Sequence, residues 1–216
     1  RRSMVDMGEY IIYSSPYGLM AVTGASARNL TEGLITPTQW QDDYYPNTIE
    51  GFYWQGRYVG FFNTGSGFGG FIFDPRDDGS LALTNLDASA LIRGGFTDPD
   101  DNELYLIIGN KLKKFQGSST NLSYNWKSKE FYTPRPVSFG FAKIDAEAYP
   151  VSFKVYGDGS AFSVTGTTPS FSATDISDTT VRLPASVHTK FAIEILADKI
   201  VNEVCIGENI EELKGA

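Results

Sequence analysis

The hexapeptide at residues 65–70, Gly-Ser-Gly-Phe-Gly-Gly, has the GxGxxG spacing of a loop that holds the phosphates of a dinucleotide. Such a loop follows a strand and opens a helix, because the pyrophosphate binds at the helix N-terminus. Residues 57–62 do resemble a strand, but residues 71–73, Phe-Ile-Phe, are aromatic and β-branched, and Asp74-Pro75 stops them. The sequence therefore predicts a β-hairpin whose glycines serve turns, and it predicts no cofactor.

Two acidic stretches, DPRDD and DPDDNE, could supply carboxylates for catalysis or for calcium. Neither has the alternating oxygen ligands, the central glycine and the terminal glutamate of a calcium-binding loop. A glycosidase needs two acids that face each other across a cleft, which linear spacing does not reveal. The acids considered for that pair are Asp98, Asp101, Glu50 and Glu103. We favour ordinary turn chemistry, because Asp bonds its own backbone in turns.

The chain contains one histidine, His188, and one cysteine, Cys205. A zinc site built from Cys and His ligands needs more of both. His188 is the only available base for a Ser-His-Asp hydrolase, and no G-x-S-x-G motif is present. We expect His188 to be an exposed loop residue before a strand, and Cys205 to be a buried strand residue. The sequence thus predicts no metal site, no catalytic residue and no enzymatic activity.

Aromatic side chains make up 14% of the chain, and several gather between residues 40 and 54. They could stack on sugar rings, anchor a protein interface or fill the core, and all three interpretations stay open with the core favoured. The aromatic residues concerned are Trp40, Tyr44, Tyr45, Tyr53 and Trp54.

The composition narrows the classes of partner. Hydrophobic residues make up 41% of the chain and charged residues 20%, which is typical of a folded protein. No apolar run approaches the roughly 20 residues of a membrane span. The net charge of −8 argues against specific nucleic-acid binding, although it suits a surface that repels DNA.

The elements that must position these residues are almost all short strands joined by glycine-rich turns. Residues 36–39, Thr-Pro-Thr-Gln, predict the start of one short helix that ends before Pro46. Residues 87–95 could add one helical turn. Hairpins are predicted at two-residue turns, 55–56 and 109–110, and at a turn over residues 16–18.

Residues 10–117 carry a weak internal repeat. A unit of strand, glycine turn and strand recurs at 10–22, 51–73 and 103–115, which suggests propeller blades. A propeller needs about four blades to close, and this stretch supplies two or three. Either the ring is incomplete, to be closed by further sequence, or this is another small β domain.

The polar segment 116–123 predicts a boundary between a propeller-like β domain, 1–117, and a second domain, 118–216. Residues 118–216 contain six to seven alternating strands, typical of an antiparallel β-sandwich. Within it, the Gly-Asp-Gly at 157–159 predicts a hairpin whose strands turn Phe153, Val155, Phe162 and Val164 inward. Residues Phe191, Ile193 and Ile195 should share one face. The predicted fold class is all-β.

Several segments resemble tail proteins of tailed bacteriophages. YSSPYGLMAVTG and ARNLTEGLITPTQW resemble a strand and short-helix segment of those proteins. GFYWQGRYVGFF, FIFDP and DNELYLIIGNKLKKF look like their propeller-type strands. YNWKSKEFYTPRPVSFGFAKIDA, VYGDG, RLP and ENIEEL look like their C-terminal sandwich. The resemblance covers roughly residues 10 to 213 and involves no catalytic motif.

The resemblance implies a non-catalytic structural protein of a phage or prophage tail, of nozzle or hub type, located in the virion and made in the host cytoplasm. It implies other tail proteins as partners and a homo-oligomeric ring around the DNA channel. The alternative, suggested by the aromatic residues, is a carbohydrate-binding module for host recognition.

Overall fold

The structure is a computed structural model that describes residues 2–76, 83–157, 169–176 and 179–214. The fold is all-β, as predicted, with 55% of residues in strands, 7% in helices and several antiparallel sheets. The chain divides into two compact units, Arg1–Gly117 and Ser118–Ala216. This division falls within the polar segment 116–123. Each unit has its own hydrophobic cores.

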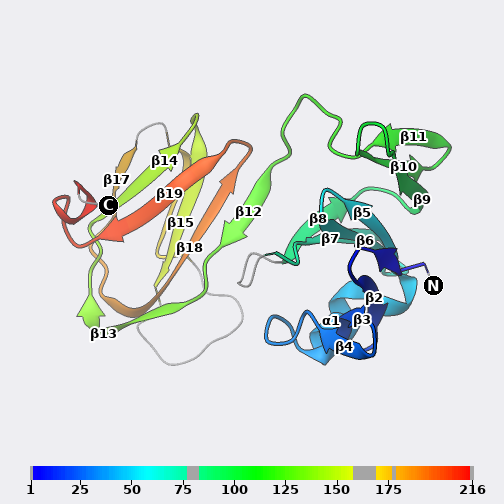
Figure 1. Cartoon of the computed structure of the whole chain (residues 1–216). Coiled ribbons are helices and arrows are strands. Elements are labelled where there is room, and N and C mark those ends of the chain that lie inside the picture. Colours follow the sequence, from blue (N-terminus) through cyan, green and yellow to red (C-terminus); the bar gives the residue numbers. More distant parts are fainter. Residues whose placement is uncertain (1, 77–82, 158–168, 177–178, 215–216) are drawn as a thin grey trace. The chain divides into compact units, whose positions relative to one another are not determined.

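In the first unit, the described residues form three sheets, each made of strands that are consecutive in the chain (Figure 1). Each strand pairs antiparallel with the next one, so each sheet is a meander. The first sheet contains β1 (Val5–Asp6), β2 (Ile11–Ser15), β3 (Gly18–Thr23) and β4 (Ser26–Asn29). The middle sheet contains β5 (Glu50–Trp54), β6 (Arg57–Asn63), β7 (Phe68–Phe73) and β8 (Leu83–Ala88). The third sheet contains β9 (Ile92–Thr97), β10 (Leu104–Ile108) and β11 (Lys111–Lys114).

The predicted tight turns of this unit are confirmed. Trp54 pairs with Arg57, so the loop between β5 and β6 is Gln55-Gly56, with φ angles of 49° and 81°. Positive φ at both positions gives the backbone twist that a two-residue hairpin needs. The turns at Pro16-Tyr17 and at Gly109-Asn110 also join strands whose flanking residues pair directly.

The one α-helix of the described residues, α1 (Pro37–Tyr44), begins as predicted at a capping box. Thr36 accepts a hydrogen bond from the Gln39 amide (3.2 Å), and the Gln39 side chain accepts one from the Thr36 amide (3.0 Å). Tyr45 ends the helix in the left-handed region, and the 3₁₀ turn η1 (Pro46–Thr48) follows. The helical turn predicted at residues 87–95 is wrong, because these residues end β8 and begin β9.

The middle sheet is buried on both faces, which explains its nearly continuous aromatic sequence. Along β6, Tyr58 belongs to the core shared with the first sheet and α1. The next residue, Val59, belongs to the core shared with the third sheet. Phe71 and Ile72 on β7 alternate in the same way. Since side chains alternate along a strand, a sheet covered on both sides needs apolar residues at every position.

Glycine and phenylalanine face each other across β6 and β7. Three successive register pairs are Gly60 with Phe71, Phe61 with Gly70, and Phe62 with Gly69. A Cβ atom at Gly60 would lie 2.5 Å from Phe71 Cζ, and one at Gly69 would lie 2.4 Å from Phe62 Cζ. The expectation that all glycines of the GxGxxG stretch serve turns is therefore partly wrong. The turn holds Gly65, while Gly69 and Gly70 make room for aromatic rings.

In the described part of the second unit, two antiparallel sheets share one core. Five strands form the larger sheet, in which β12 and β13 both pair with β18, and β15 lies between β18 and β16. Its strands are β12 (Tyr124–Lys127), β13 (Phe131–Val137), β15 (Val151–Gly157), β16 (Phe171–Ile176) and β18 (His188–Ala197). The smaller sheet has β14 (Phe141–Ala146), β17 (Thr180–Arg182) and β19 (Val201–Gly207), and the 3₁₀ turn η2 (Glu212–Lys214) follows.

The inward-facing residues of the second unit agree with the sequence pattern where they are described. Phe153 and Val155 lie in the core together with Phe191, Ile193 and Ile195. The predicted inward residues Phe162 and Val164, and the turn at 158–159, lie outside the described residues. Among the described residues, β15 pairs with β16 on one side and with β18 on the other.

Candidate functional site

The five aromatic residues considered from the sequence are not gathered at one exposed site. Trp40, Tyr44 and Trp54 are buried core residues. Trp40 and Tyr44 stack at 5.0 Å between ring centroids, and the Trp40 indole donates a hydrogen bond to the Ser15 carbonyl (2.8 Å). Trp54 packs edge-on to Phe115. These three rings have no free face for a sugar.

The other two aromatic residues are more accessible. Tyr45 is 37% exposed and stacks on Phe62 at 6.4 Å between centroids. Tyr53 is partly buried against the core of the first and middle sheets. Tyr45 is therefore the most exposed of the five, and it lies beside Phe62, a residue that lines the pocket described next.

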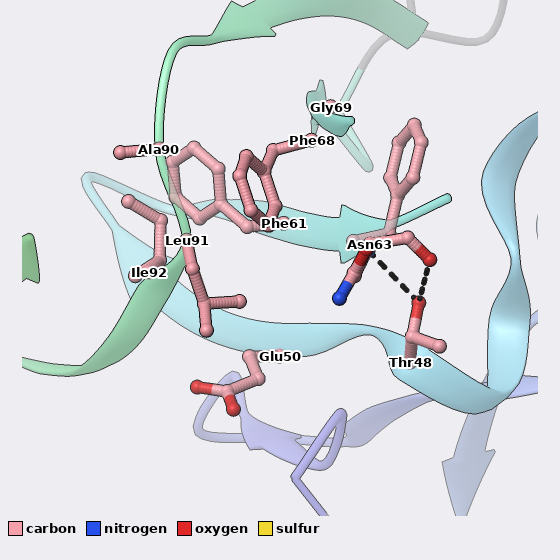
Figure 2. A pocket seen from close by; sticks show the side chains of 10 residues that line it. Thr48, Glu50, Phe61, Asn63, Phe68, Gly69, Ala90, Leu91 and Ile92 are labelled. Carbon is pink, nitrogen blue, oxygen red and sulfur yellow. Dashed lines mark hydrogen bonds between the residues drawn. The ribbon is translucent and has the colours of Figure 1, made fainter. Parts of the chain in front are cut away.

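A small pocket lies between one end of the middle sheet and the start of β9 (Figure 2). The rings of Phe61 and Phe68 lie next to each other in it, with Leu91 and Ile92 nearby. Its cavity volume is about 20 Å³. Phe68 and Leu91 are 38% and 40% exposed, which makes them the accessible apolar part of the lining.

The polar groups of this pocket are already partnered within the unit. Glu50 accepts a hydrogen bond from Arg2 at 2.9 Å. The Thr48 hydroxyl donates to the Asn63 carbonyl (3.1 Å) and accepts from the Asn63 amide (3.0 Å), as Figure 2 shows. The pocket is smaller than the roughly 300–1,000 Å³ of most small-molecule sites. Its lining has one carboxylate, Glu50, and neither a second acid nor a histidine, so the arrangement can hold the tip of an apolar side chain or the edge of one sugar ring.

The acidic residues considered for catalysis form turns and ion pairs. Asp98 and Asp101 accept hydrogen bonds from the amides of Asp100 and Glu103, respectively, both at 3.0 Å. Tyr105 donates to Asp101 at 2.8 Å, which lowers the pKa of this carboxyl. Glu103 pairs with Lys114 at 3.2 Å. These contacts agree with the turn interpretation.

Asp74, from the other acidic stretch, connects two arginines at the end of β7. Arg76 donates two hydrogen bonds to its carboxylate, at 2.8 and 2.7 Å, and Arg57 donates a third at 2.8 Å. The Arg76 side chain is the main reason why the pKa of Asp74 lies well below its usual range. This cluster links the start of β6, at Arg57, to the end of β7, at Asp74. We assign it a structural role.

His188 and Cys205 lie differently from the sequence expectation. His188 is the first residue of β18, is half-buried and packs edge-on to Phe191, so it is not an exposed loop residue. Its Nε2 atom shares a hydrogen bond with the Ser186 hydroxyl (2.5 Å). No carboxylate orients the other ring nitrogen, Nδ1, which is buried without a partner among the described residues. Cys205 is on strand β19 as expected, but it is half-buried.

A polar network on the outer face of the larger sheet of the second unit was not predicted from the sequence. The Glu194 carboxylate accepts from Lys154 (2.8 Å) and from Tyr156 (2.7 Å), and Lys154 lowers the pKa of Glu194. Lys127 lies over the Tyr156 ring, 3.8 Å from its centroid. The sequence of β18 does indicate a polar outer face, because Lys190 and Glu194 alternate with the core residues of this strand.

No protein-family model matches this sequence, and a comparison with curated proteins finds no match. Among the described residues, no group of three or more His, Cys, Asp or Glu side chains could hold a metal ion. None of the helices in the described part of the chain is long and apolar enough to span a membrane.

Proposed function

We propose that this chain is a structural component of a phage or prophage tail, of nozzle or hub type, which acts by protein–protein assembly and has no catalytic role. The observation that carries the proposal is the first unit: three consecutive antiparallel meanders whose faces pack on one another through two aromatic cores. A propeller is built in this way, because each of its blades is a small antiparallel sheet that packs on the next blade. The second unit, with two sheets around one core, suits the sandwich expected from the resemblance.

The negative net charge of the chain supports a location beside DNA, where the DNA slides past the protein without binding to it. The net charge of −8 repels phosphates, and an acidic channel wall would leave the DNA mobile. In this proposal the chain resides in the virion tail, with other tail proteins and further copies of itself as partners.

The first experiment is the mass of the purified chain in solution, by light scattering over a concentration series, together with DNA binding at low salt. We expect association with increasing concentration and no detectable DNA affinity. A chain that binds DNA tightly at low salt would contradict the role of the acidic charge.

A carbohydrate-binding module is the second candidate, and the pocket around Phe68 favours it. Exposed Phe68 and Leu91 beside Glu50 and Asn63 combine an apolar surface with polar groups, as sugar sites do. If this candidate is right, a glycan array gives a hit that Phe68→Ala removes. Phe96→Ala, which truncates another exposed phenylalanine, is the matched control. An array without hits rejects the candidate.

A further inference from the structure

We draw no further inference here: the strongest candidate, the small apolar cavity at one end of the larger sheet of the second unit, which His188 lines with its Nδ1 atom buried and without a described partner, carries none, because residues 158–168 between β15 and β16 lie outside the described residues and nothing in the described structure shows what fills it.

Discussion

At the scale of single residues, the most restrictive feature is the set of glycine–phenylalanine pairs across β6 and β7. Phe71 is fully buried and lies directly over Gly60. Its ring also contacts Trp40 edge-on and stacks with Tyr58, at 5.6 and 5.8 Å between centroids, so it has little room to move. The missing side chain at Gly60 is thus a packing requirement and not a backbone one.

We expect Gly60→Ala to lower the free energy of unfolding by about 1–3 kcal/mol, because the added methyl group overlaps Phe71. The measurement is chemical denaturation. Gly67→Ala is the matched control, since the nearest atom to its added Cβ lies 3.6 Å away. Equal stability of the two variants would contradict the packing argument.

Asp74→Asn tests the arginine cluster at the end of β7. The pKa of Asp74 is lowered in the folded protein, so its stabilising effect is complete above its unfolded pKa of about 4. The effect is lost as the pH falls through the lower pKa of the folded state. We expect Asp74→Asn to cost about 1–2 kcal/mol at pH 7, since Arg76 is largely exposed and solvent weakens that pair.

The difference between Asp74→Asn and the unmodified chain should shrink progressively below about pH 4. Denaturation at pH 7, 4 and 2.5 measures it. Asp87→Asn, at an exposed aspartate, is the control and should change little at any pH. A destabilisation by Asp74→Asn that stays constant over this range would show that the charge of Asp74 is not its cause.

At the scale of elements, α1 is short and depends on its cap and on its two buried rings. A helix of eight residues is too short to be stable alone. Trp40 and Tyr44 attach it to the core of the first and middle sheets, and the Thr36–Gln39 box satisfies amides of its first turn.

We expect Thr36→Ala to destabilise the first unit by about 1 kcal/mol, because the Gln39 amide loses its acceptor. Thr38→Ala, within the same first turn and exposed, removes an equal side chain without a capping bond and should be nearly neutral. Urea denaturation of both variants measures the difference. If Thr38→Ala is as harmful as Thr36→Ala, loss of the capping bond is not the cause, because helix propensity favours alanine over threonine at both positions.

At the scale of the whole molecule, the chain consists of two units with separate cores, joined through an exposed polar segment. Leu122 in this segment is 85% exposed. Nothing in either core depends on it, so the segment can open without unfolding a sheet.

Limited proteolysis with chymotrypsin should therefore produce an early cut at Leu122. We expect two fragments that each keep a β-type circular dichroism spectrum, because each retains its own hydrophobic core. Mass spectrometry locates the cut. Simultaneous loss of both fragments, without a stable intermediate, would show that the two units fold only together.

Much of the candidate site could not be predicted from the sequence. From the sequence, Trp40 and Trp54 could be core residues or exposed rings that bind a sugar or a protein. In the structure, both are buried core residues. The pocket formed by Phe61, Phe68 and Leu91 was not predicted, because β6, β7 and the segment between β8 and β9 meet there only after folding. Their spacing in the chain contains no sign of this meeting.

By itself the sequence determined the all-β class, the capping box at Thr36 and the tight turns at 55–56 and 109–110. These features depend on a few neighbouring residues, whose backbone preferences and local hydrogen bonds act within one turn or one strand. Only the tertiary structure decided which glycines make room for rings, which acids bind arginines and which aromatic rings are buried. Those outcomes depend on residues distant in the chain that share a volume or a charge, and local pattern carries no information about that partner.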